Sequence, residues 1–383
     1  MPLPYNKKAK KWKDMEDKLI TVAIHTAPKA HILQQTLESN GIQTRLVEVI
    51  NPDNTSSGGF AVRIHEDNLT KALGIIERIG LFRYNDEQTI KVDDGRKRIL
   101  VAIDFSDYSM KACKTAFGIA HRMNAKVKIL HVYKLHYPIT FPFADMLDEK
   151  KENDILDKAR RQMLDFCYEI DRKIIEKEFP SVNYSYSLRE GNVEDEIEAF
   201  VEEYKPFLLV VGSKGESNSA SSSLGSVTAD IIEMTDVPVM AVPENTKINK
   251  NEDIKHIAFL TNFQEKDLES FDNLVNILKP YPKVRATLLH INVKDRKGDK
   301  WTETELLGMK EYFSRKYPDL NVVYDVIDSQ NMLEAINYYV DAEEVNILAM
   351  NSRRRNLLGR IFMPSITRKV LLNNNVILVV FRG

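Results

Sequence analysis

The residues best suited to chemistry lie in one stretch, VVGSKGESNSASSSLGSVTADII, in the middle third of the 383-residue chain. It holds three glycines, Gly212, Gly215 and Gly225, and Ser226 follows the last of them. Glycine allows sharp turns and lets the backbone approach a ligand with no Cβ in the way. Because an apolar run ends at Gly212 and a helical pattern begins after Gly225, we predict a ligand-binding loop between a strand and a helix.

The residues that open the predicted helix are suited to binding a phosphate. The backbone amides of Ser226, Val227 and Thr228 have no partner inside a helix, and together with the helix dipole they form an anion site. The hydroxyls of Ser226 and Thr228 add donors for phosphate oxygens. The spacing is neither that of a Walker A loop nor that of a GxGxxG fingerprint. A long loop whose glycines only permit turns is the alternative interpretation.

No pattern for a positioned nucleophile or a metal clamp accompanies this loop. The sequence has no HExxH or GxSxG motif, and no acidic cluster near the loop beyond Asp104 and Glu216. His131 stands alone at the end of a predicted strand, where a packed strand residue is the simpler interpretation. The serine run Ser217–Ser223 is either a phosphorylation target, a set of phosphate ligands or a flexible polar loop. We therefore predict a binding protein rather than an enzyme.

Composition and charge exclude several functional classes. The chain is 43% hydrophobic and 29% charged with a formal net charge of −2, so no basic excess points to nucleic acid. Apolar runs such as Pro206–Val211 and Val376–Phe381 are far shorter than the roughly 20 residues of a membrane span. The amino-terminal residues lack the apolar core of a secretory signal, and Cys113 and Cys167 have no metal-ligand spacing. We expect a cytoplasmic protein with neither nucleic acid nor membrane among its partners.

Residues 1–95 are predicted to form a small α+β domain. The pattern is strand, helix, strand, strand, helix, at Leu19–His25, Ala30–Ser39, Thr44–Ile50, Phe60–His65 and Leu69–Ile79. This order is typical of a ferredoxin-like sandwich. It also resembles a small domain of bacterial proteins with a presumed signalling role, and it carries no catalytic motif.

Residues 96–245 alternate between strands and helices, which predicts an α/β fold with a doubly wound parallel sheet. Ile99–Ile103 has the continuous apolar run of a strand buried on both faces, and Ser106 is placed to cap the helix that follows. The other expected strands are Val127–Val132, Val182–Leu188, Phe207–Val211 and Val237–Val242. The other expected helices are Lys150–Lys177, Val193–Tyr204 and Val227–Met234.

Residues 254–383 repeat this order, so we predict a second doubly wound domain that arose by duplication. The alignment matches Gly212 with Asn351, Gly215 with Arg354, Gly225 with Pro364, Asp104 with Asn262 and Ser226 with Ser365. Three lost glycines place side chains where a ligand would pass, so we expect a structural and pairing partner rather than a second site. The run Arg353–Arg355 is interpreted as a solvated charged loop, with a phosphate or an acidic partner as the alternative.

The last strands of the two predicted domains, Val237–Val242 and Val376–Val380, are short and apolar. Exposed apolar edges invite aggregation unless they are paired, and neither strand carries the lysines that often guard a free edge. We expect the two strands to pair antiparallel within the chain. Association of whole chains into a homodimer is then optional.

The glycine loop and the segment Lys97–Ser106 (KRILVAIDFS) resemble the ATP-binding loop and the first strand of universal stress proteins. The resemblance is close from Lys97 to Pro243 and loose from Ile254 to Phe381. It implies the tandem, two-domain type of that family, with HUP-like (adenine-nucleotide-hydrolase-like) domains and a role in stress response or regulation. The implied ligand is ATP or another adenine nucleotide, with Mg²⁺ as an optional companion.

The same resemblance implies roles for single residues. Asp104 and Val132 would face the adenine and the ribose, and Ala102 stands where nucleotide-binding members often have proline. Gly212 and Gly215 would pack along the ribose and the phosphate chain. The phosphates would be held by Gly225, Ser226, Val227 and Thr228.

Two other functions stay open beside nucleotide-dependent regulation. One is a slow ATPase or nucleotidyl-transfer enzyme of related fold, and the other is a scaffold that binds no nucleotide. For Asp104 the alternative role is a carboxylate that caps the turn before the next helix.

Overall fold

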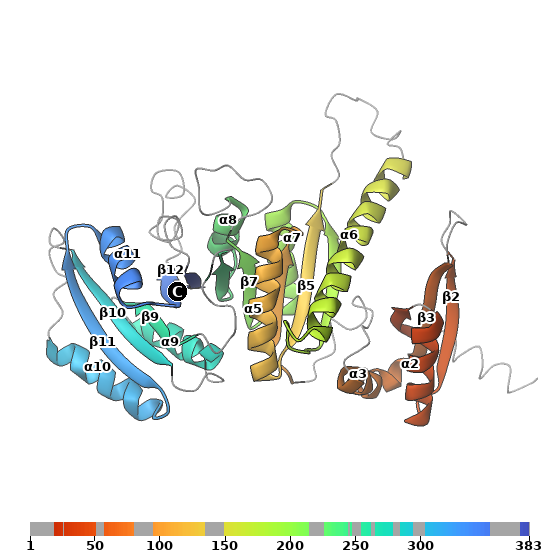
Figure 1. The fold of residues 1–383 in the computed structure, drawn as a ribbon, viewed down its shortest axis with the longest axis horizontal. Helices are drawn as coiled ribbons and strands as arrows, with labels where there is room; N and C mark the ends of the chain where they lie inside the picture. The colour runs from red at the N-terminus through yellow and green to blue at the C-terminus, as the bar shows by residue number, and fades with distance from the viewer. Residues whose placement is uncertain are drawn as a thin grey trace, which may run out of the picture. The chain divides into compact units, whose positions relative to one another are not determined.

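The computed structural model describes residues 19–25, 27–50, 57–79, 95–134, 149–213, 226–243, 246, 254–261, 265–278, 284–293, 303–352 and 376–382. The chain divides into two compact units (Figure 1). The first consists of Met1–Arg96 with Val182–Ser187, and the second consists of Lys97–Ser181 with Leu188–Gly383.

The amino-terminal unit contains a three-stranded antiparallel sheet in the order β1-β3-β2. Its elements are β1 (Leu19–His25), α2 (Ala27–Ser39), β2 (Thr44–Ile50), β3 (Ser57–His65), a 3-10 turn (Glu66–Asn68) and α3 (Leu69–Ile79). Apolar side chains of both helices and the sheet form its core, among them Val22, Leu33, Ile64 and Ile76. The predicted order of elements is confirmed for these residues, whereas the assignment to a ferredoxin-like fold stays a prediction.

Residues 98–382 contain one ten-stranded sheet, and the first half of this sheet comprises residues 98–242. The elements of this half are β4 (Arg98–Ile103), α5 (Asp107–Met123), β5 (Lys126–Tyr133), α6 (Glu149–Ile175), β6 (Tyr184–Glu190), α7 (Val193–Tyr204), β7 (Leu208–Gly212), α8 (Ser226–Met234) and β8 (Val239–Val242). All of them were expected, with ends that differ by a few residues. Ser106 and Asn192 cap α5 and α7, because their side chains accept hydrogen bonds from backbone amides of the first turn.

The second half follows with the same alternation of strands and helices. Its elements are β9 (His256–Leu260), α9 (Glu265–Leu278), β10 (Arg285–Val293), α10 (Glu303–Lys316), β11 (Asn321–Ser329), α11 (Met332–Ala342), β12 (Ile347–Ser352) and β13 (Ile377–Arg382). Strands β9, β12 and β13 are apolar and almost completely buried, as strands covered on both faces should be.

The strand order of the ten-stranded sheet is β11-β10-β9-β12-β13-β8-β7-β4-β5-β6. Each half therefore arranges its strands in the same way, and the two halves meet at β13 and β8. These two strands are antiparallel, with Leu378 opposite Ala241 and Val380 opposite Val239. The expected antiparallel pairing is confirmed, and it leaves neither apolar strand exposed at a sheet edge.

The strand registers agree with the alignment of the two halves. Gly212 of β7 lies opposite Val242 of β8, and Asn351 of β12 lies opposite Phe381 of β13. The two partners of each pair are the same number of residues apart in the sequence. Gly212 and Asn351 therefore occupy equivalent places in the two halves.

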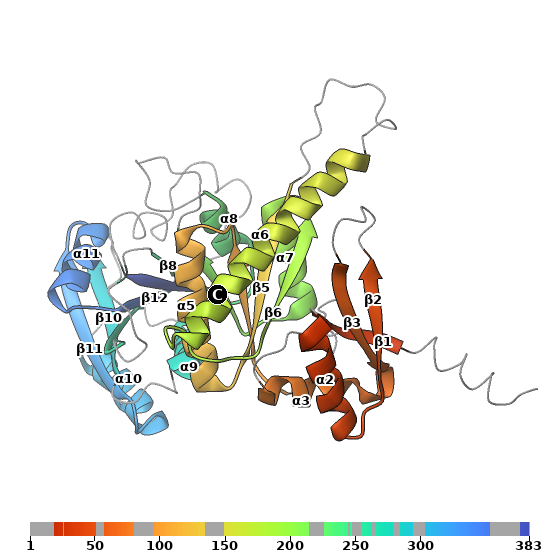
Figure 2. The ribbon, with the colours of Figure 1, turned by 45° about the vertical axis from the view of Figure 1, so that its right-hand side comes forward.

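Helices cover both faces of the sheet in the first half. Right-handed crossovers place α5 and α6 on one face and α7 and α8 on the other (Figure 2). Contacts between α7 and α8 and between α5 and the central strands β4 and β7 agree with this arrangement. The apolar stripe of α5 is buried as expected, except for Met123, which is half-buried at the end of the helix.

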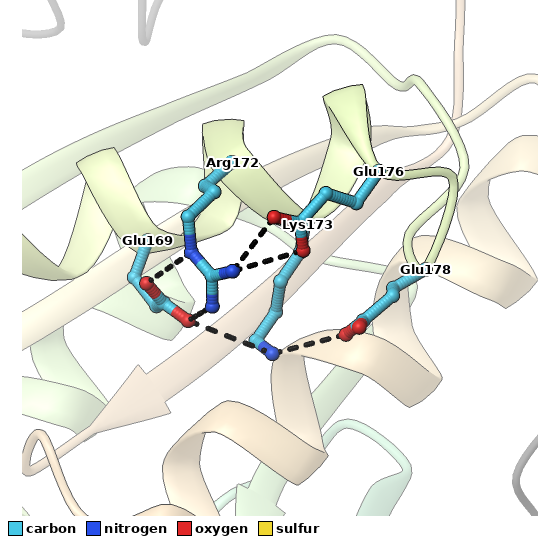
Figure 3. A network of polar contacts seen from close by, with 5 residues as sticks. All are labelled: Glu169, Arg172, Lys173, Glu176 and Glu178. Carbon is cyan, nitrogen blue, oxygen red and sulfur yellow. Dashed lines mark hydrogen bonds and ion pairs between the residues drawn. The ribbon is translucent and has the colours of Figure 1, made fainter.

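The carboxyl end of α6 carries a network of charged side chains (Figure 3). Arg172 donates hydrogen bonds to the carboxylates of Glu169 and Glu176, and Lys173 lies 3.0 Å from a carboxylate oxygen of Glu178. The hydrogen bond from Arg172 is the main cause that holds the pKa of Glu169 below its ordinary value. These pairs face solvent, so they contribute little to stability and are screened by salt.

Candidate functional site

The strand order places a topological switch point between β4 and β7. The chain leaves β4 for β5 on one side, and it returns through β6 and α7 to β7 on the other side. Crevices outside the carboxyl ends of strands at such a point are where open α/β sheets bind ligands. The register pairs Ala102 with Val211 and Ile103 with His131.

The residues that come next along these strands are three of those singled out from the sequence. Asp104 follows Ile103, Val132 follows His131, and Gly212 follows Val211. Parallel strands end at the same edge of the sheet, so these three residues lie at the carboxyl edge beside the switch point. Ala102 lies deeper along β4 and is half-buried.

Helix α8 begins at Ser226, and its first turn is attached to the end of β7. The hydroxyl of Thr228 donates a hydrogen bond of 2.8 Å to the carbonyl oxygen of Gly212. Both groups are buried, whereas Ser226 is exposed and Val227 is half-buried. The amino end of α8, whose first amides have no partner within the helix itself, is thereby held at the switch point.

This bond changes one detail of the expected site. The Thr228 hydroxyl was predicted to donate to a phosphate, but in this structure it donates to Gly212. The buried carbonyl of Gly212 needs a donor, since an unpaired buried carbonyl is costly. Thr228 therefore positions the helix through its hydroxyl, and the predicted role of its backbone amide in binding phosphate stays a prediction. Gly215 and Gly225 lie outside the described residues.

Asp104 makes the contacts of a turn cap. Its Oδ1 accepts hydrogen bonds from the backbone amide of Ser106 at 3.1 Å, from the Ser106 hydroxyl at 2.5 Å and from the Ser109 hydroxyl at 2.7 Å. These bonds close the turn between β4 and α5, as the alternative interpretation expected. The turn in question includes Phe105, whose φ of 66° lies in the left-handed region that a bulky residue rarely adopts.

Phe105 and His131 form a tilted ring pair at the same edge. Their ring centroids are 4.1 Å apart, and the ring of Phe166 from α6 meets Phe105 at 5.8 Å. The Nδ1 of His131 lies 2.9 Å from the carbonyl oxygen of Ile103, which only an N–H can satisfy. Burial is the main cause that lowers the pKa of His131, so the neutral ring predominates at neutral pH and its Nε2 is an acceptor.

Phe105 was not among the predicted site residues, although it lies in the Asp-Phe-Ser turn that carried the family resemblance. A bulky residue between a strand end and a helix cap was the available signal. Strained backbone of this kind is concentrated at functional sites.

The equivalent place in the second half is filled by side chains. The Asn351 amide donates to Asp267 Oδ1 at 2.5 Å, and its carbonyl oxygen accepts from the Ser270 hydroxyl at 2.6 Å. Thr261 donates to the other carboxylate oxygen of Asp267 at 2.8 Å. In the first half the positions of Asn351, Asp267 and Ser270 are taken by smaller residues, which are Gly212, Ser109 and Ala112.

This closed cluster supports the expectation that a ligand cannot pass between β9 and β12. Asp267, Ser270 and Thr261 are almost completely buried, and their polar groups satisfy one another. Asn262, which was aligned with Asp104, lies outside the described residues, and so do Arg353–Arg355, Pro364 and Ser365, which were compared with the glycine loop.

Among the residues that the structure describes, no three His, Cys, Asp or Glu side chains are grouped so as to hold a metal ion. No helix in that part of the chain is both long and apolar enough to span a bilayer.

Part of the chain is similar to known proteins. Residues 95–243 match the model of the universal stress protein family. Over 147 residues the chain is 29% identical to universal stress protein YxiE of Bacillus subtilis, which covers 38% of this chain and 97% of that protein. It is 28% identical over 147 residues to the universal stress protein A homolog of Haemophilus influenzae, which covers 38% of this chain and 96% of that protein.

A solved universal stress protein from Archaeoglobus fulgidus has the same fold over a longer stretch. It matches with a TM-score of 0.58 at 16% identity and covers 74% of this chain and 96% of its own. At this identity the match shows the fold alone. Residues 95–243 are a universal stress protein domain with the doubly wound α/β fold of that family.

Proposed function

We propose that this domain binds ATP or another adenine nucleotide at the carboxyl edge between β4 and β7, and that the protein acts in stress response or its regulation. One observation carries the proposal. The hydrogen bond between Thr228 and Gly212 fixes the amino end of α8 at the switch point of the sheet. A helix amino end at that place supplies amide donors and a positive dipole end for phosphate oxygens.

Each residue of the edge has a role in this proposal. The phosphates are bound by the backbone amides of Ser226, Val227 and Thr228, with Gly215 and Gly225 giving the loop its close approach. Gly212 leaves space beside the sugar because it has no side chain. Asp104 and Val132 border the base and the ribose, and Asp104 also keeps the turn before α5 closed. Ala102 is part of the floor of the crevice, and Mg²⁺ accompanies the phosphates where the nucleotide carries it.

We further propose that the chain is a tandem protein with one working site. Residues 254–382 have the strand order of the first half, and the Asn351–Asp267–Ser270 cluster occupies their crevice. The pairing of β8 with β13 satisfies both apolar strands inside one chain, so a homodimer is not required for stability. The ferredoxin-like assignment of residues 1–95 and a cytoplasmic location belong to the same proposal.

Two experiments test the proposal. Mass spectrometry of small molecules released from the purified, denatured full-length protein identifies the nucleotide that it carries. Calorimetric titration with ATP then compares the wild type with Gly225→Val, which we expect to lose binding because a β-branched side chain blocks the approach to phosphate. Gly308→Val is the matched control, since a Cβ at Gly308 on α10 meets no atom within 4 Å.

A blank titration of the folded wild type, with no nucleotide released, would favour a scaffold that binds none. The enzyme alternative requires turnover. It is supported if ATP is hydrolysed by the wild type and hydrolysis is lost in Asp104→Asn while binding persists.

A further inference from the structure

The carboxyl end of α8 is held by a residue from the far end of the chain. Arg382, the last residue of β13, donates through Nη1 to the carbonyl oxygen of Thr235 at 3.2 Å, and its Nε lies 3.5 Å from Oδ1 of Asp236. Thr235 directly follows α8, and its side chain is 2% exposed. The Arg382 side chain is 15% exposed, so this cation is held, largely buried, at the negative end of the helix.

The opposite end of α8 is the anion-binding end of the proposed site. The helix has nine residues, so its two ends are about 13 Å apart. Thr228 attaches the first turn to Gly212, and Arg382 attaches the residue after the last turn to the second half. A short helix that is attached at both ends moves as one body, so a shift of its amino end also displaces its carboxyl end and disturbs the contact with Arg382.

The anchor in the second half is itself firmly held. Arg382 lies opposite Ser352 in the pairing of β12 with β13, and Ser352 directly follows Asn351. The side chain of Asn351 is fixed by Asp267 and Ser270. The filled crevice of the second half therefore fixes the end of β12, and through the strand pair it fixes the backbone of Arg382.

We propose that Arg382 is a positioning residue for the nucleotide site, through which the second half sets the affinity of the first. The inference rests on the proposed function and adds its regulation. When Arg382 holds Thr235 and Asp236, α8 is kept in the place where its amides meet phosphate. Without that contact α8 is displaced or frayed in a larger fraction of the molecules. Because only the remaining fraction can bind nucleotide, the apparent Kd rises.

The experiment is calorimetric titration of full-length protein with ATP. We expect Arg382→Ala to raise Kd about fivefold, which is the size of effect that a cation at a helix end produces. Arg382→Lys keeps the charge but not the forked guanidinium that reaches Thr235 and Asp236 together, so its Kd should lie between those of the wild type and Arg382→Ala. Arg285→Ala is the matched control, because Arg285 also makes ion pairs in the second half but pairs with Asp325 and Glu343.

Hydrogen exchange supplies a readout that a purely structural role would not move. In the wild type, added ATP should slow exchange at Thr235, Asp236 and the backbone of β13. In Arg382→Ala the slowing should persist at the first turn of α8 and disappear in β13. Equal Kd values for Arg382→Ala and Arg285→Ala, or equal protection of β13 in Arg382→Ala and the wild type, would overturn the inference. Absence of ATP binding in the wild type would instead refute the proposed function, and this inference with it.

Discussion

His131 and His290 make the same contact in the two halves of the sheet. The Nδ1 of His131 lies 2.9 Å from the carbonyl oxygen of Ile103, and the Nδ1 of His290 lies 2.8 Å from that of Thr261. Each histidine thus ties the second strand of its half to the end of the first. The surroundings of the two rings differ otherwise, because the Nε2 of His290 lies 3.1 Å from Oδ1 of Asn292, whereas the ring of His131 contacts the ring of Phe105 at a tilt.

The stoichiometry of nucleotide binding should be one per chain. Gly212 adds no side chain at the proposed site of the first half, while Asn351 and its partners fill the equivalent place in the second. Calorimetric titration of the full-length protein measures this number directly. Two equivalent sites would contradict the prediction and would require the Asn351 cluster to open for ligand.

Thr228→Val should weaken both the fold and nucleotide binding. The substitution keeps the shape of the side chain but removes the donor to the buried Gly212 carbonyl, which costs about 1 kcal/mol or somewhat more. Urea unfolding measures the loss of stability, and titration with ATP measures the loss of affinity. Thr228→Ser retains the hydroxyl and is the control. Wild-type affinity in Thr228→Val would show that this bond does not position α8.

The free energy of unfolding should fall as the pH drops below about 6.5. Burial is the main cause that lowers the pKa values of His131 and His256 below their ordinary 6.5. The unfolded chain takes up these protons near pH 6.5, and the folded chain takes them up only at lower pH. The stabilisation is therefore fully present above pH 6.5, and it falls with falling pH until the two histidines of the folded chain are protonated as well.

Urea unfolding between pH 8 and pH 5 measures this dependence. His131→Gln keeps a donor for the Ile103 carbonyl and should flatten part of the pH dependence, leaving the share of His256. Stability that rises on acidification through this range would contradict the assignment of neutral buried rings.

The fragment Lys97–Asn245 should dimerise or aggregate at tens of micromolar. Without residues 254–382, β8 lacks β13 and exposes an apolar edge. Analytical ultracentrifugation measures the outcome, and the fragment Lys97–Arg382 is the control in which the edge stays paired within the chain. A stable monomer of the shorter fragment would show that the free edge is tolerated.

Much of the fold was predictable because its signals are local. Strands such as β4 and β7 are continuous apolar runs, and Ser106 and Asn192 mark helix starts that the structure confirms. The prediction of a duplication rested on the repeated order of elements, and the agreement of the registers at Gly212 and Asn351 supports it. Strand ends were less accurate, because the ends depend on pairing with neighbours rather than on composition.

The contacts that define the candidate site were harder to predict. The bond from Arg382 to Thr235 joins residues 147 positions apart, and no local pattern marks it. From the sequence, the Thr228 hydroxyl could donate to a phosphate or to a backbone carbonyl. Only the packing of α8 against β7 shows that it donates to the carbonyl of Gly212. The left-handed backbone of Phe105 is likewise set by the surrounding hydrogen bonds and not by the preference of phenylalanine.

The antiparallel junction of β8 and β13 also determines how many nucleotide-dependent surfaces one chain can present to a partner. Because the halves run in opposite directions, the carboxyl ends of their strands lie on opposite borders of the sheet, and the proposed nucleotide site lies on the border of the first half alone. A partner that distinguishes the loaded from the empty state therefore meets a single epitope on each chain. Its recognition is monovalent, and any gain in avidity has to come from bringing several chains together.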